Sequence, residues 1–327
     1  MRWLRKSWPY FLLALLIIVN AGVLWQRERL ADWWRLRNYT APQDIASLAT
    51  DDTMTPVARN FFYVNHPQLE NKDSFNTHCA DRSEKTAVLG CYRGNRQGIY
   101  IYAVIDARLS GVRQVTAAHE TLHQAYDRLS AKEREHIDAL LEDFYEHTLT
   151  DQAIKDKIES YKSQPNVVLV NEMHSIFGTE VRQLTPELEQ YYKKYFDNRG
   201  KIVDYRDAYQ AEFTRRQTLV ENYDKQLAGL KKEIDTNKST LEDEMTFLNT
   251  KEKAINQDAN KGDQAAYQSD IIAYNDMVER YNALLTTTRG QISQYNQIAN
   301  QRNDIAVEEQ QLQQALDSRL TTPNTKQ

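Results

Sequence analysis

The residues best suited to chemistry lie within residues 115–126, which contain the pattern His-Glu-x-x-His. His119 and His123 are four residues apart, so on a helix their imidazoles lie on one face, one turn apart, as two ligands of a single zinc ion must. The alanine and leucine residues of the stretch favour a helix with an apolar face. Two unrelated histidines on an ordinary helix are the alternative. The spacing favours a zinc helix, with His119 and His123 as ligands and Glu120 as the catalytic general base.

A catalytic zinc site needs a third protein ligand and an open position for water. A ligand six residues after the second histidine, as in metzincins, would fall at Leu129, so that pattern is excluded. Residues 169–180 offer Glu172, His174 and Glu180. Glu172 and His174 point about 200° apart on a helix, so both cannot reach one ion. Glu180 stays open as an alternative because a glutamate on an apolar face needs a partner.

The same segment contains Asn171-Glu172 followed by Ser-Ile-Phe-Gly-Thr at residues 175–179. Together with His-Glu-x-x-His, this segment resembles the gluzincin metallopeptidases, and it is most similar to their thermolysin-type second motif. The resemblance is limited to these two motifs. It implies that Glu172 is the third zinc ligand, that the domain is a zincin-like α+β fold, and that zinc-activated water hydrolyses peptide bonds with Glu120 as base.

Two supporting roles are less well defined by the sequence. The thermolysin-type motif has an aspartate that supports a zinc-bound histidine, and this chain lacks it. Asp127, one turn after the second histidine, is a candidate replacement that would orient an imidazole; an ordinary surface aspartate is the alternative. An oxyanion also needs a hydrogen-bond donor. The candidates for that donor are His174, Tyr126, Tyr191 and Tyr192.

The N-terminus has the features of a membrane anchor. Basic residues precede an apolar run over residues 8–25, and eighteen helical residues span about 27 Å, close to the hydrocarbon thickness of a bilayer. Trp33 and Trp34 fit an interfacial aromatic belt. A cleaved signal peptide, with its cleavage site near residues 19–21, is the alternative. We expect residues 1–38 to form an uncleaved single-pass anchor and juxtamembrane segment, with the remainder on the extracytoplasmic side of the cell membrane.

Cysteine usage agrees with export. Cys79 and Cys91 are the only cysteines, and two cysteines this close in an exported chain predict one local disulfide. Two free buried thiols are the alternative.

Residues 99–104 follow shortly after, and their β-branched and aromatic side chains predict a strand just before the zinc helix. The edge of such a strand is a candidate site for an extended peptide, and a plain core strand is the alternative.

The C-terminal half has a different pattern. Residues 201–320 contain no proline and only three glycines, and their apolar residues recur at heptad spacing on both sides of a polar turn near Gly262. This pattern predicts an antiparallel coiled-coil hairpin, followed by a disordered tail over residues 321–327. The hairpin is expected to bind a protein partner or to dimerise. The net charge of −5 argues against nucleic acid as a partner.

The sequence therefore predicts a mainly α protein with a small β element. A zincin-like metallopeptidase domain over residues 39–200 is followed by the coiled coil. The predicted function is a membrane-anchored, Zn²⁺-dependent endopeptidase acting on a peptide or protein substrate. The alternative is a non-catalytic envelope scaffold whose coiled coil recruits a partner and whose zinc site is structural or vestigial.

Overall fold

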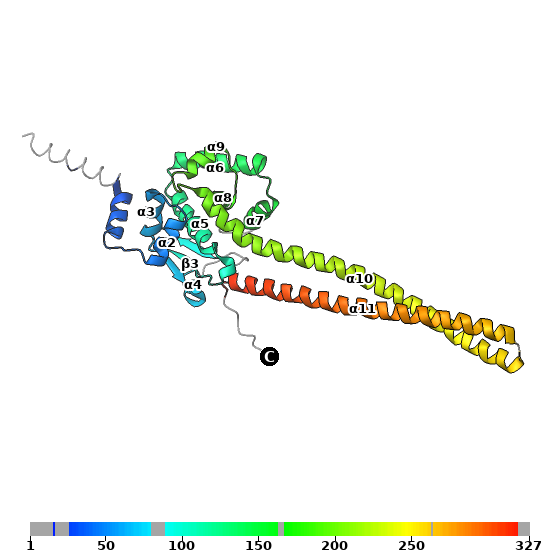
Figure 1. The fold of residues 1–327 in the computed structure, drawn as a ribbon. Helices are drawn as coiled ribbons and strands as arrows, with labels where there is room; N and C mark the ends of the chain where they lie inside the picture. Colours follow the sequence, from blue (N-terminus) through cyan, green and yellow to red (C-terminus); the bar gives the residue numbers. More distant parts are fainter. Residues whose placement is uncertain (1–15, 17–25, 80–88, 163–166, 263, 320–327) are drawn as a thin grey trace, which may run out of the picture. The chain divides into compact units, whose positions relative to one another are not determined.

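The computed structural model describes residue 16 and residues 26–79, 89–162, 167–262 and 264–319 (Figure 1). The expected membrane span, Leu16 apart, and the expected disordered tail lie outside these residues. Within the described part of the chain, no helix is long and apolar enough to cross a membrane. The chain divides into two compact units, one made of residues up to 210 together with those from 314 onward, and one made of residues 211–313.

The first unit is mainly helical with one small sheet, as predicted. A helix over residues 26–36 opens it. The elements that follow are α2 (Gln43–Asp51), α3 (Pro56–Val64), β1 (Gln68–Glu70), α4 (Lys72–His78), β2 (Gly90–Arg93), β3 (Gly98–Tyr102), α5 (Val112–Asp127), α6 (Ala131–Asp143), α7 (Gln152–Lys162), α8 (Leu169–Glu180) and α9 (Pro186–Tyr192).

The sheet has three strands in the order β1-β3-β2. β3, the strand predicted before the zinc helix, lies in the middle and is almost wholly buried. β1 pairs with it in parallel, with Leu69 opposite Ile101. β2 pairs with it antiparallel, with Cys91 opposite Tyr100. Both β2 and β3 pack on α5, so the sheet supports the helix that carries the histidine motif.

Helix α5 lies in the middle of the core and packs most extensively on α8. Leu122 and Phe177 are fully buried. Gly178 permits the close approach, because a Cβ atom there would lie 2.3 Å from Leu122 Cδ1 and 2.8 Å from Tyr192 Cε1. Such a distance is far below van der Waals contact, so any larger residue would push the two helices apart. The α5–α8 contact fixes the geometry of the site described below.

Local capping residues begin several of these helices. Thr55 and Thr185 cap α3 and α9, each followed by proline at the first helical position. Ser130 and Glu133 form a capping box at the start of α6. Helix α9 ends at Tyr192. The chain leaves the helix there because Phe196 forms a β-bridge with Met54.

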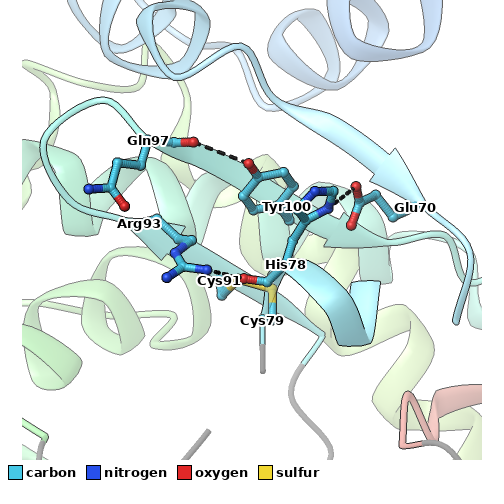
Figure 2. The surroundings of a disulfide bond; sticks show 7 residues. All are labelled: Glu70, His78, Cys79, Cys91, Arg93, Gln97 and Tyr100. Atoms are coloured by element: carbon cyan, nitrogen blue, oxygen red, sulfur yellow. Dashed lines mark hydrogen bonds and ion pairs between the residues drawn. A yellow bond between two sulfur atoms is a disulfide. The ribbon is translucent and has the colours of Figure 1, made fainter. Parts of the chain in front are cut away.

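The predicted disulfide is confirmed: Cys79, at the end of α4, is bonded to Cys91 in β2. Figure 2 shows the polar groups around it. The ring of His78 stacks on Tyr100, with centroids 4.3 Å apart, and its Nδ1 lies 2.6 Å from Glu70 Oε1. The disulfide and this cluster together join α4 to all three strands.

The second unit lies within two long helices, α10 (Arg199–Lys261) and α11 (Gln264–Leu316), which pack together. Residues near the start of α10 contact residues near the end of α11, and residues near the end of α10 contact residues near the start of α11. The pair is therefore antiparallel. The contacts are Arg216–Glu308, Asp224–Arg302, Asn237–Gln291 and Lys251–Asp270. Ile234, Leu248 and Ile298 are among the buried residues of this pair. Asn237, which interrupts the heptad pattern, donates a hydrogen bond to Gln291 of the other helix.

Candidate metal centre

The histidine motif lies on α5 and Glu172 lies in the first turn of α8. The rings of His119 and His123 lie 4.8 Å apart, edge to face, on one side of α5, as the four-residue spacing predicts. Glu172 faces them from the neighbouring helix. The free N–H groups at the start of α8 favour a negative charge at this position. Two packed helices therefore bring the three predicted ligands together.

The donor atoms are spaced as a metal site requires. Glu172 Oε2 lies 3.6 Å from His119 Nε2, and Glu172 Oε1 lies 3.7 Å from His123 Nε2. All three donor positions fall within 4.8 Å of one another. Donors bound tetrahedrally to zinc at about 2.1 Å are separated by about 3.4 Å. The two nitrogens and one carboxylate therefore fit a single ion, and a tetrahedral ion would have one further position for water or substrate.

The electrostatics of the three groups also suit a cation. Burial lowers the pKa of His119, which favours the neutral imidazole that a metal needs. Burial acts against the charge of Glu172, but His123 and His119 outweigh it and hold the pKa of the carboxyl at about 2. The carboxylate is therefore ionised at neutral pH. Burial lowers the pKa of His123, but Glu172 and Glu120 outweigh this and raise it overall. A metal at this ring therefore competes with a proton.

The second nitrogen of His123 is held by residues of α8. Its Nδ1 lies 3.1 Å from Asn171 Oδ1 and 3.3 Å from Ser175 Oγ. A contact from Nδ1–H to Asn171 leaves Nε2 as the lone-pair nitrogen that faces Glu172. Asp127, the sequence candidate for this role, is instead exposed and hydrogen-bonded by Tyr92. At His123 Nδ1 the partners are Asn171 and Ser175 of α8, and the exposed Asp127 agrees with the alternative of a surface aspartate.

Glu120 lies on α5 next to His119 and is only 6 % exposed. The strand β2 passes directly over it. A Cβ atom on Gly90 would lie 2.6 Å from Glu120 Oε1 and 2.8 Å from its Cγ, so the carboxylate is packed against the strand backbone at a residue that has no side chain. A buried carboxylate at this position is held in a restricted orientation, as a general base must be. This contact could not be predicted from the sequence, because it depends on how the sheet packs on α5.

The two rival third ligands lie elsewhere. Glu180 is 7 % exposed and its Oε1 lies 2.5 Å from Lys157 Nζ. Burial would raise the pKa of Glu180, but Lys157 outweighs burial and lowers it. Its charge therefore has a partner without a metal. His174 is fully buried, and its Nε2 lies 2.8 Å from the Tyr191 hydroxyl.

The aromatic residues proposed as oxyanion donors form one cluster around His174. The rings of Tyr126, Tyr191 and Tyr192 lie 5.4–5.6 Å from the His174 ring. Their hydroxyls are already engaged: Tyr126 donates to Asp138, and Tyr192 donates to the His174 carbonyl. These contacts give the four residues a structural role in packing α5, α8 and α9. Among the described residues, the hydroxyls of the three tyrosines bond within this cluster or to Asp138, and not to the His119, His123 or Glu172 side chains.

Comparisons of the chain with protein families, with curated proteins and with solved structures find no match.

Proposed function

We propose that this chain is a membrane-anchored, zinc-dependent endopeptidase that hydrolyses peptide bonds on the extracytoplasmic side. The proposal is carried by one observation: His119, His123 and Glu172 place three metal-ligating atoms within 4.8 Å of one another. Glu120 lies beside them on the same helix, buried and ionisable. Two imidazoles and one carboxylate with an open fourth position are a ligand set typical of catalytic zinc.

Each group in the site has a separate role in the proposed reaction. Zinc bound by these three ligands would supply Lewis acidity and lower the pKa of water towards about 7. Glu120 then accepts a proton from the attacking water and later donates it to the leaving nitrogen. Asn171 holds the His123 ring in the ligating tautomer. The ligand side chains are only 12–14 % exposed, which limits competing water around the reacting atoms.

The proposed location rests on separate features. The apolar run over residues 8–25 has the length of a membrane span. The Cys79–Cys91 disulfide is typical of oxidising compartments outside the cytoplasm. The substrate is then an extracytoplasmic peptide or protein. We propose that the α10–α11 pair binds a protein partner or a second copy of the chain.

The test is Glu120→Gln in the full chain. We expect the variant to bind zinc as the wild type does and to lose hydrolysis of a generic protein such as casein, because the amide cannot accept the proton. A chelator should abolish wild-type hydrolysis, and added zinc should restore it. Undiminished hydrolysis by the variant would reject this mechanism. A wild-type chain that binds zinc but cleaves nothing, with or without chelator, would instead support the envelope scaffold.

A further inference from the structure

Acidic side chains join helix 26–36 to the rest of the first unit. Asp32 is 6 % exposed, and its Oδ1 accepts hydrogen bonds of 2.8 Å from both Arg96 and Arg128. Glu28, one turn earlier, lies 3.1 Å from Arg128 Nη1 and also pairs with Arg96. Arg96 lies in the turn between β2 and β3, and Arg128 caps the end of α5. Two acidic residues of the helix therefore bind two arginines next to the motif helix.

The C-terminal end of the same helix is held by contacts of a different kind. Arg35 Nε donates to the Val64 carbonyl at 2.5 Å. The His66 ring lies 3.4 Å from the Arg35 carbonyl and stacks on Tyr39, with centroids 4.5 Å apart. These contacts and the acidic pairs fix the rotation of the helix about its own axis. They therefore determine which of its side chains face outward.

The outward face is aromatic and basic. Leu30, Trp33 and Trp34 are 48, 63 and 61 % exposed, and the guanidinium of Arg37 lies 3.5 Å from the centre of the Trp34 ring. At 100° per residue these four side chains fall within an arc of about 100°, roughly opposite Asp32. Arg27 and Arg29 flank this arc and are also exposed. We call these six residues the tryptophan face.

We infer that the tryptophan face lies flat in the headgroup region of a bilayer that contains anionic phospholipid. Exposed tryptophan and leucine bordered by arginine is the composition of an interfacial helix. Tryptophan favours this region because its ring is apolar and its N–H remains hydrated. The three arginines complement anionic headgroups. The apolar run of residues 8–25 ends next to Gln26, which favours a bilayer over a second copy of the chain as the partner of this face.

The inference rests on the proposed membrane anchoring, but it uses none of the proposed catalytic residues. If the helix lies flat, the first unit has a defined orientation relative to the membrane. Because Glu28 and Asp32 bind arginines beside α5, a helix that lies flat on the membrane fixes the direction in which the metal-site unit faces. A helix that merely continued upright from the span would leave Trp33 and Trp34 in water, more than a full turn above the span.

The test measures depth along the helix in the full chain. Single cysteines at residues 30, 31, 33, 34, 36 and 37 are spin-labelled, since Cys79 and Cys91 are bonded to each other. The protein is reconstituted in phosphatidylethanolamine–phosphatidylglycerol vesicles, and accessibility to oxygen and to a nickel chelate is compared. We expect Leu30→Cys, Trp33→Cys and Trp34→Cys to report one shared shallow depth, and Ala31→Cys and Leu36→Cys to report protein contact.

Three outcomes would overturn the inference. Depth that decreases steadily with residue number would mean an upright helix. Full water accessibility at every position would mean no bilayer contact. Dipolar broadening between labels at residue 33 would place a second copy on this face. A label at exposed Val168, on the first unit, is the control for a site away from the helix.

A double variant distinguishes failure of the membrane inference from failure of the proposed peptidase activity. Trp33→Ser combined with Trp34→Ser should abolish the shared depth of a label at Leu30, while zinc content and hydrolysis of a soluble protein stay unchanged. Unchanged depth in this variant would refute the role of the tryptophans. The peptidase proposal fails instead through Glu120→Gln, which leaves the depth profile untouched.

Discussion

Gly90→Ala tests the contact between the strand β2 and the proposed general base. The added methyl would lie 2.5 Å from Thr116 Cγ2 and 2.6 Å from Glu120 Oε1, where ordinary contacts begin at 3.4 Å. The Glu120 carboxylate must therefore shift by roughly 0.8 Å, because the close-packed interior offers little other space. Misplacing a catalytic group by about 1 Å costs on the order of 100-fold in rate. Overpacking is expected to cost about 1–3 kcal/mol of stability.

The assay compares hydrolysis of casein, zinc content by mass spectrometry and the thermal unfolding midpoint. We expect Gly90→Ala to keep one zinc per chain and to lose about 100-fold in kcat, because Glu120 is not a ligand. Gly94→Ala is the matched control, since its added methyl would meet only Asp127 Oδ2 at 3.8 Å. Full activity in Gly90→Ala with an unchanged melting temperature would refute the reasoning.

A second variant separates a shifted base from general misfolding. Thr116→Ser removes the methyl that meets the new side chain and keeps the hydroxyl that bonds to the Val112 carbonyl. In the Gly90→Ala background it should restore part of the lost stability and leave the rate low. Recovery of both the stability and the rate would mean that the clash with Thr116, and not a shift of Glu120, caused the loss of activity.

Three further predictions concern residues other than the proposed ligands and general base. Asn171→Ala should weaken zinc binding by about 10- to 100-fold, measured by competition with a chelator, and unchanged affinity would show that its contact with His123 is dispensable. Asp52 is fully buried, and neither carboxylate oxygen has a hydrogen-bond partner among the described residues. Burial and Asp51 raise its pKa against the opposing effect of Lys201, so the folded state loses stability as pH rises above the ordinary value of 3.8. Asp52→Asn should therefore raise the urea midpoint at pH 7 by more than at pH 4; an equal effect at both would contradict this. Reducing the Cys79–Cys91 disulfide should cost about 3 kcal/mol in free energy of unfolding, and an unchanged midpoint under reductant would oppose it.

The features that the sequence predicted well depend on local signals. The four-residue spacing of His119 and His123 needs only a helix to bring them together. The capping box at Ser130 and the long helices α10 and α11 likewise follow from short-range patterns. The disulfide follows from having two cysteines close together in the chain. In each case, the residues that determine the feature lie close to one another in the sequence.

The features that the sequence did not predict depend on contacts between distant segments. Glu180 looked like a ligand because it lies among apolar residues, and its partner Lys157 comes from a different helix. Asn171 lies within the second motif, yet only the packing of α8 on α5 shows that it faces His123. The contact of Gly90 with Glu120 likewise needs the fold of the sheet over α5. Short sequence patterns do not predict such pairs, because the two residues lie on different elements and meet only when those elements pack together.

The central claim is that His119, His123 and Glu172 hold one zinc ion. The most direct test is zinc stoichiometry and affinity in the full chain, measured after removal of metal and titration with zinc against a chromogenic chelator. We predict one zinc per wild-type chain, a loss of affinity of several orders of magnitude in Glu172→Gln, and little change in Glu180→Gln. Wild-type protein that binds no zinc, or Glu172→Gln that binds it as tightly as the wild type, would contradict the assignment.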